Sequence, residues 1–139
     1  MEITANALQT VAENQNILFT DTVVCGRCSI VHREGSGLVR LKGLTDQCRA
    51  RYKVSFGGNL AIPTGGTVGA ISVAIAIDGE AVATTNMIVT PAAVEEFWNV
   101  FSAIYLDIPR GCCSQISVRN TSTQAIDVQN ANLIIERVA

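Results

Sequence analysis

The chain has 139 residues, which corresponds to one domain at roughly 100–200 residues per domain. Only 16% of the residues are charged, against about 25% in typical proteins, whereas 41 are valine, isoleucine or threonine. This composition favours a β-sheet protein and argues against disorder or a coiled coil. The formal net charge of −2 gives no electrostatic reason to expect binding to nucleic acid or to an anionic membrane.

Residues 1–14 are polar with weak apolar positions, and we interpret them as an N-terminal arm or edge segment ahead of one domain over residues 15–139. The start of the chain lacks a basic region followed by an apolar core, so we expect no secretory signal. The longest nearly apolar window, residues 68–77, is shorter than the about 20 residues that a membrane helix requires. We therefore expect the protein to remain in the cytosol in which it is made.

The segment Cys25-Gly26-Arg27-Cys28, with His32 and Cys48 further along, contains residue types that bind zinc. Zinc sites usually have a second closely spaced ligand pair, whereas Cys48 stands alone. A redox C-x-x-C motif would open a helix after a strand, a unit that this chain lacks. Reduced or opportunistically bridged thiols are the favoured interpretation, and we expect neither a metal nor a cofactor. Cys25, Cys28, His32 and Cys48 are the candidate ligands if zinc does bind.

A half-buried strand is predicted over residues 51–56, because Tyr52, Val54 and Phe56 alternate with polar residues. At its start, Arg49 and Arg51 are expected to pair with Asp46 or Asp107 across an interface rather than to bind phosphate. The shortage of charge is concentrated beyond this strand. From residue 54 to residue 94 the only ionisable side chains are those of Asp78 and Glu80, so this stretch must be covered.

Large apolar side chains alternate with small uncharged ones over residues 71–77, where Ala74 and Ala76 belong to the small face. Because neither face carries charge, we expect both to be covered, as in a strand at a subunit interface. The Asp78-Gly79 pair follows directly and lies between two apolar runs. It predicts a hairpin with a type I′ turn, in which both central residues have positive φ.

The next elements are a short helix and an aromatic strand. Thr90-Pro91 offers an N-cap and a first-turn proline, which predicts one helical turn over residues 92–96. Over residues 98–108 a strand is predicted, with these side chains inward: Trp98, Val100, Ile104, Leu106 and Ile108. Phe97, Phe101 and Tyr105 lie on the opposite face. Two faces therefore compete for one core, and we expect one of them to meet another subunit.

Near the end of the chain, the apolar spacing over residues 125–138 changes phase at Asn130, which predicts a β-bulge. In total the runs predict about eight to ten short strands, as in an antiparallel sandwich or barrel. We expect no enzyme. The one histidine, His32, has no serine in a G-x-S-x-G motif that it could activate. Glu95 and Glu96 are adjacent in the sequence, so their side chains diverge and do not form a catalytic carboxylate pair.

The motifs are, in chain order, the strands 37–41 and 51–56, the hairpin at Asp78-Gly79-Glu80, the aromatic strand, the turn Ile108-Pro109-Arg110-Gly111, the segment 117–122 and the terminal strand 131–135. This order resembles the tumour-necrosis-factor and complement-like jelly roll, especially its compact versions in spore-surface glycoproteins and phage virion proteins. The resemblance covers about residues 16–138. It implies an all-β antiparallel jelly-roll sandwich that forms a homotrimer.

In such a trimer, aromatic and small residues lie against a threefold axis, and the interface candidates are Ala74, Ala76, Phe97, Phe101 and Tyr105. The resemblance further implies a non-enzymatic phage virion protein, assembled in the bacterial cytoplasm, which decorates the outer capsid or forms a head fibre. Its partner would be the major capsid protein, with contact candidates in the arm at Met1, Glu2, Ile3, Gln9 and Glu13. The alternative is a carbohydrate- or receptor-binding module on a phage fibre or a spore surface.

Overall fold

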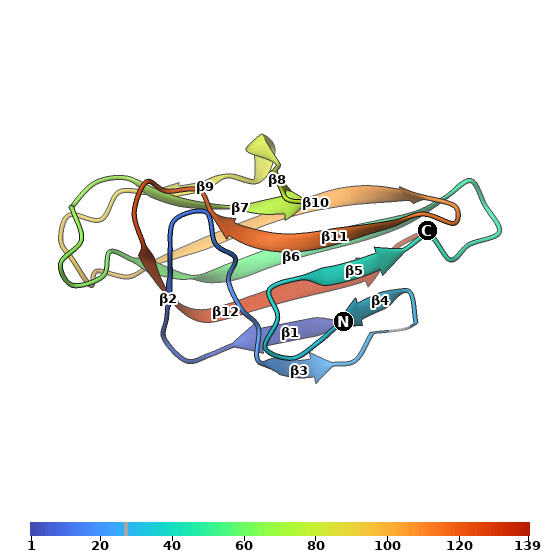
Figure 1. Ribbon diagram of the computed structural model, residues 1–139, viewed down its shortest axis with the longest axis horizontal. Helices are drawn as coiled ribbons and strands as arrows, with labels where there is room; N and C mark the ends of the chain where they lie inside the picture. The colour runs from blue at the N-terminus through green and yellow to red at the C-terminus, as the bar shows by residue number, and fades with distance from the viewer. Residues whose placement is uncertain (27) are drawn as a thin grey trace.

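The computed structural model describes residues 1–26 and 28–139 and consists of two antiparallel sheets packed face to face (Figure 1). Sheet A has the order β10 (Trp98–Pro109), β6 (Arg49–Ala61), β12 (Ile126–Arg137), β1 (Glu2–Ala5) and β3 (Asp21–Val24), and β2 (Gln9–Val11) pairs with β12. Sheet B has the order β4 (Ile30–His32), β5 (Val39–Lys42), β11 (Cys113–Asn120), β7 (Ile71–Ile77) and β8 (Glu80–Ala81), and β9 (Met87–Val89) pairs with β7.

The predicted antiparallel sandwich is confirmed, with 12 strands in the described residues instead of eight to ten. The additional strands are short edge elements such as β2, β8 and β9, which contain too few residues to show a period. A 3₁₀ turn, η1 (Ala83–Thr85), lies between β8 and β9. Within residues 1–26 and 28–139, no helix is long and apolar enough to cross a membrane.

The core lies between the sheets and follows the alternation seen in the sequence. Tyr52, Val54 and Phe56 of β6 are fully buried, and their neighbours Arg51, Lys53 and Ser55 face outward. The Tyr52 hydroxyl donates to the carbonyl oxygen of Lys42 at 2.7 Å, so its polar atom is satisfied at the edge of the core.

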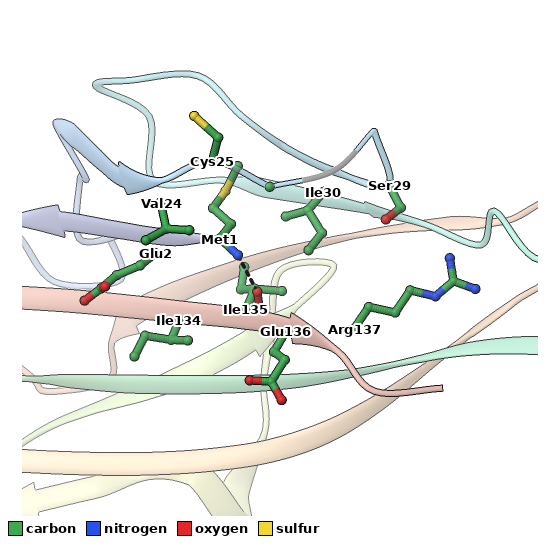
Figure 2. Close-up of a pocket in the computed structure, with 11 residues that line it drawn as sticks. Met1, Glu2, Val24, Cys25, Ser29, Ile30, Ile134, Ile135, Glu136 and Arg137 are labelled. Carbon is green, nitrogen blue, oxygen red and sulfur yellow. Dashed lines mark hydrogen bonds between the residues drawn. The ribbon is translucent and has the colours of Figure 1, made fainter.

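Residues 1–14, which the sequence led us to interpret as an N-terminal arm or edge segment, form two strands of sheet A and no separate arm. β1 lies inside sheet A, where Ile3 pairs with Leu133 of β12 on one side and with Thr22 of β3 on the other. The Met1 ammonium group donates to the carbonyl oxygen of Ile135 at 2.7 Å (Figure 2). The physical reason is that β12 would otherwise expose an open edge, and that the Ile3 side chain completes the core.

The predicted hairpin turn and the predicted β-bulge are both confirmed. Asp78 and Gly79 both have positive φ, 51° and 87°, and connect β7 to β8 as a hairpin. Asn130 has a φ of 55°, and the register between β12 and β6 shifts between Gln129 and Asn132, which is the predicted bulge.

The predicted helical turn over residues 92–96 does not form. Glu95 instead has a positive φ of 60°, and its N–H donates to the carbonyl oxygen of Ile62 at 2.7 Å. Its carboxylate accepts a hydrogen bond from the Thr64 hydroxyl. Contacts with the segment that follows β6 therefore override the local preference for a helix.

Both faces of β7 are covered, as predicted, but the cover belongs to the same chain. Ala74 and Ala76 are 1% and 0% exposed. Ala76 pairs with Ala81 of β8, and Arg119 lies opposite Ala74 and donates to the carbonyl oxygen of Gly79 at 2.6 Å, so its side chain extends along this face. Because neither alanine offers surface to a second subunit, their assignment to a trimer interface is wrong.

Candidate assembly surface

The outward face of sheet A is the most distinctive surface of the molecule. We call it the sheet A face, and its central residues are Asn99, Phe101, Ala103, Tyr105 and Asp107 of β10, Arg49, Arg51, Lys53, Ser55, Gly57 and Asn59 of β6, and Asn132, Ile134 and Glu136 of β12. Phe101 and Tyr105 are 67% and 65% exposed, more than any other large apolar side chain in the described residues. Exposed aromatic side chains that share one face are typical of an interface.

Cross-strand register divides this face into layers. Phe101 lies opposite Gly57, and Ala103 lies opposite Ser55. A side chain at Gly57 would contact the Phe101 ring, since a Cβ there lies 3.8 Å from the ring edge. Gly57, Ala103 and Ser55 are too small to cover the neighbouring rings. The rings of Phe101 and Tyr105, one on each side of Ala103, therefore remain accessible to a partner protein.

An amide layer borders the aromatic residues at one end of the face. Nδ2 of Asn99 donates to Oδ1 of Asn59 at 3.2 Å, and Nδ2 of Asn59 donates to Oδ1 of Asn130 at 3.4 Å. This row crosses β10, β6 and β12. Sequence reasoning missed it because only the register between distant strands brings these residues together.

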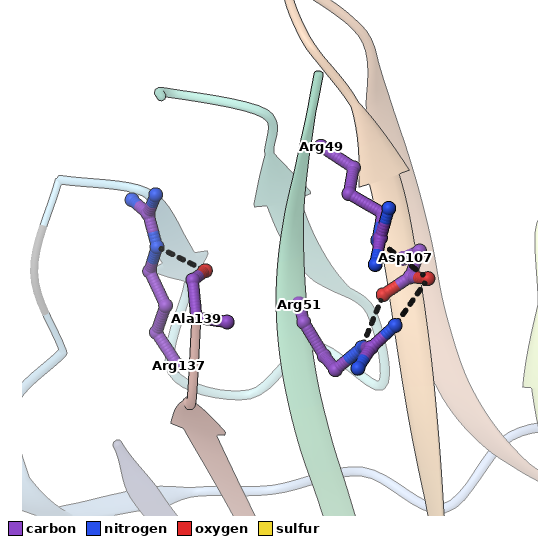
Figure 3. Close-up of polar contacts among 5 residues, drawn as sticks. All are labelled: Arg49, Arg51, Asp107, Arg137 and Ala139. Carbon is purple, nitrogen blue, oxygen red and sulfur yellow. Dashed lines mark hydrogen bonds and ion pairs between the residues drawn. The ribbon is translucent and has the colours of Figure 1, made fainter. Parts of the chain in front are cut away.

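An ion-pair layer borders the face at the other end (Figure 3). The Asp107 carboxylate accepts hydrogen bonds from Nε and Nη2 of Arg51 at 2.7 and 3.1 Å, and Nε of Arg49 lies 3.1 Å from it. The hydrogen bonds from Arg51, and then the charges of the two arginines, hold the pKa of Asp107 below its ordinary value. Arg49 and Arg51 thus pair with Asp107 within one chain, not across an interface as expected.

Of the remaining aromatic candidates, Phe97 lies just before β10 and is exposed. The predicted inward position of Trp98 is wrong, since 47% of this residue is exposed and its Nε1 donates to Glu96 at 3.1 Å. Trp98 lies at the very end of the β10–β6 pairing, where the indole N–H finds an acceptor in the adjoining loop.

The candidate zinc ligands are not gathered in one site. Cys25 and Cys28 lie between β3 and β4, His32 is on β4, and Cys48 precedes β6, each cysteine being exposed and unpaired. Nε2 of His32 donates to the carbonyl oxygen of Ser36 at 2.9 Å. Arg27, inside the C-x-x-C motif, lies outside the described residues. The remainder of the chain contains no group of three or more His, Cys, Asp or Glu residues able to hold a metal ion.

The candidate capsid contacts are dispersed as well. Met1 and Glu2 line a cavity of about 570 Å³ next to the ends of β3 and β12 (Figure 2), whereas Ile3 is fully buried and cannot touch a capsid. The Gln9 side chain exchanges two hydrogen bonds with the backbone of Leu18, at 2.9 and 3.0 Å, and Glu13 is exposed.

No protein-family model matches the chain, and no curated protein sequence matches it. Among solved structures, the chain is similar to a tumour necrosis factor of Spodoptera frugiperda named Eiger, with a TM-score of 0.67 and 13% identity over 100% of this chain and 92% of that one. It is also similar to the globular domain of zebrafish complement protein 1qA, with a TM-score of 0.63 and 11% identity over 96% and 93% of the two chains.

A third similar structure is murine APRIL, with a TM-score of 0.59 and 11% identity over 95% of this chain and 96% of that one. The fold is the tumour-necrosis-factor and complement-type jelly roll. At these identities the likeness concerns the TNF-like fold alone, and the fold implied by the order of the sequence motifs is confirmed. A bacterial or phage origin and a trimeric assembly stay predictions.

Proposed function

We propose that the protein is a non-enzymatic module that assembles as a homotrimer through the sheet A face. The observation that carries this proposal is the exposure of Phe101 and Tyr105, two aromatic side chains on the same face of one strand with only Ala103 between them on that face. Burial of such anchors against a second copy supplies most of the free energy of association in typical interfaces.

The trimer, in this proposal, is a virion component that decorates the outer surface of a phage capsid. The order of the sequence motifs supports this, because it resembles compact jelly rolls of virions. Of the contact candidates, Met1, Glu2 and Gln9 are half-buried and Glu13 is exposed, and Gln9 and Glu13 lie together at the margin of sheet A. The capsid partner would be the major capsid protein, and the decoration would reinforce the shell or present a surface.

The assembly is tested with the double variant Phe101→Ser and Tyr105→Ser, measured by size-exclusion chromatography with light scattering. We expect three chains per particle for the unchanged protein and one for the variant, with the same circular dichroism spectrum. Ile88→Ser is the matched control, since Ile88 is 62% exposed but belongs to β9 in sheet B. A monomeric unchanged protein, or a trimer that survives the double variant, would contradict the proposed interface.

The capsid role is tested by co-sedimentation of purified trimers with capsids that lack this protein. Saturable binding is expected, and it should weaken in a Gln9→Ala and Glu13→Lys double variant that still forms trimers. Absence of binding at saturating protein would refute decoration. Saturable binding of a sugar on a glycan array, without capsid binding, would replace it with the carbohydrate- or receptor-binding alternative.

A further inference from the structure

Two loops that carry cysteines meet at one end of the sandwich, where β10 turns into β11 (Figure 1). The N–H of Gly43 donates to the carbonyl oxygen of Cys112 at 2.8 Å, and the N–H of Arg110 donates to the carbonyl oxygen of Cys48 at 3.0 Å. These hydrogen bonds join the β5–β6 loop to the β10–β11 turn. The same turn leads into Cys113, the first residue of β11.

Cys113 differs from the other cysteines in its surroundings. Its Sγ accepts a hydrogen bond from Nη2 of Arg40 at 3.2 Å, and Lys42 is its direct partner in the pairing of β11 with β5. Cys113 is nevertheless exposed, so a reagent in solution can reach the sulfur. An accessible thiol with basic side chains beside it is the environment in which reactive cysteines occur.

These residues line a hollow of about 170 Å³, which also contains Gly43, Leu44, Gly111 and Cys112. In the described part of the chain, no carboxylate lines this hollow. A third basic group lies beside it, because Nη1 of Arg137 donates to the carbonyl oxygen of Leu44 at 2.6 Å. The hollow is therefore a place where an anion would be attracted and held against a thiol.

We propose that Cys113 is a modification site for anionic low-molecular-weight disulfides, such as the disulfide of glutathione. The Cys113 thiol gives its proton to solvent, and its sulfur attacks one sulfur of the bound disulfide. A new S–S bond forms to Cys113 while the S–S bond of the reagent breaks, and the second half leaves as a thiolate. The reagent is thus the oxidant, and a reducing thiol reverses the reaction.

Charge is the source of selectivity in this site. Carboxylates on the reagent would be attracted by Arg40 and Lys42, and the negative charge shared by the three sulfur atoms during exchange lies next to the Arg40 guanidinium. A neutral disulfide gains only the second of these effects. The anionic reagent should accordingly modify Cys113 before Cys25, Cys28, Cys48 or Cys112.

The test uses the full chain and two probe disulfides, the anionic dithiobis-nitrobenzoate and the neutral dithiodipyridine, with stopped-flow absorbance and peptide mass mapping. We expect the fast phase with the anionic probe to map to Cys113, to vanish in Cys113→Ser and to persist in Cys112→Ser. In Arg40→Gln, the anionic-to-neutral rate ratio should fall about fivefold, as expected for one unit charge at about 4 Å in water.

Arg33→Gln is the matched control, since Arg33 is an exposed arginine in the turn after β4 and should leave the ratio unchanged. Glutathione disulfide should then add one glutathionyl group, at Cys113, which dithiothreitol removes. First modification at another cysteine, an unchanged ratio in a folded Arg40→Gln protein, or no adduct with glutathione disulfide would overturn the proposal.

Discussion

Asp107 lies directly opposite Arg51 in the pairing of β10 with β6. Nε and Nη2 of Arg51 donate to the two oxygens of the Asp107 carboxylate. Arg49 contacts that carboxylate from the next outward position on β6. Two arginines thus share one carboxylate at the border of the sheet A face. The free energy of unfolding should therefore depend on whether Asp107 is ionised.

The pH dependence of this contribution has a definite sign. Because the pKa of Asp107 is lowered by Arg51 in the folded protein, its ionised form stabilises the fold at neutral pH. We expect Asp107→Asn to lower the midpoint of urea unfolding at pH 7. The difference from the unchanged protein should begin to shrink below about pH 4 and should vanish as the pH falls through the lowered pKa. A difference independent of pH would show that packing, not charge, is responsible.

Substitution of the buried Ala76 and of the exposed Ala103 distinguishes an effect on folding from an effect on assembly. Ala76→Arg would bury a charge with no partner, and we expect a loss of about 3 kcal/mol or more in the free energy of unfolding. Ala103→Arg places the same side chain on the exposed sheet A face, where we expect a folded monomer. Chemical denaturation and light scattering on both variants measure the two effects. A folded, trimeric Ala76→Arg protein would contradict the buried position of Ala76.

Thr85 connects η1 to the edge of β7. Its buried hydroxyl accepts from the N–H of Ile75 at 2.9 Å and donates to the carbonyl oxygen of Val82 at 2.7 Å. Thr85→Val keeps the shape but leaves the Ile75 N–H unpaired, while the Val82 carbonyl oxygen keeps its hydrogen bond from the N–H of residue 85, so we expect a loss of about 2 kcal/mol in urea denaturation. Thr84→Val, at the exposed neighbouring residue, should change stability by less than about 0.5 kcal/mol. Equal effects of the two changes would refute a structural role for the hydroxyl.

Gly43 allows the β5–β6 loop to approach the β10–β11 turn. A Cβ at this position would overlap the carbonyl oxygen of Pro109, which is backbone and cannot move aside. We expect Gly43→Ala to cost about 3 kcal/mol and to lower the melting temperature. Gly69→Ala is the control, because a Cβ there has no atom within 4 Å. A Gly43→Ala protein as stable as this control would show that the two loops do not need their close approach.

The elements that could be predicted from the sequence are those determined by neighbouring residues. The alternation at Tyr52, Val54 and Phe56, the turn at Asp78-Gly79 and the phase change at Asn130 each reflect backbone preferences or a period of two, which operate over a few residues. The outward direction of Phe101 and Tyr105 follows from the same period.

The wrong predictions concern contacts between residues far apart in the chain. No local pattern reveals that Ile3 lies between Thr22 and Leu133, or that Arg119 extends over the outer face of β7. A small, uncharged face indicates only that something covers it, and here side chains of the same chain, such as that of Arg119, do so. The hollow at Cys113 was missed for the same reason, since the β11–β5 register places Lys42 beside it.

The pairing of β1 with β12 joins the first strand of the chain to the last. On the ribosome, β1 therefore cannot pair with β12 until residues 126–137 have been made, and until then β6 has only β10 as a partner in sheet A. Such non-local pairing is slow and leaves apolar strands unpaired during synthesis. Translation pauses or early termination within residues 126–137 should thus yield aggregation-prone chains that engage chaperones, whereas β12, once made, pairs with both β6 and β1.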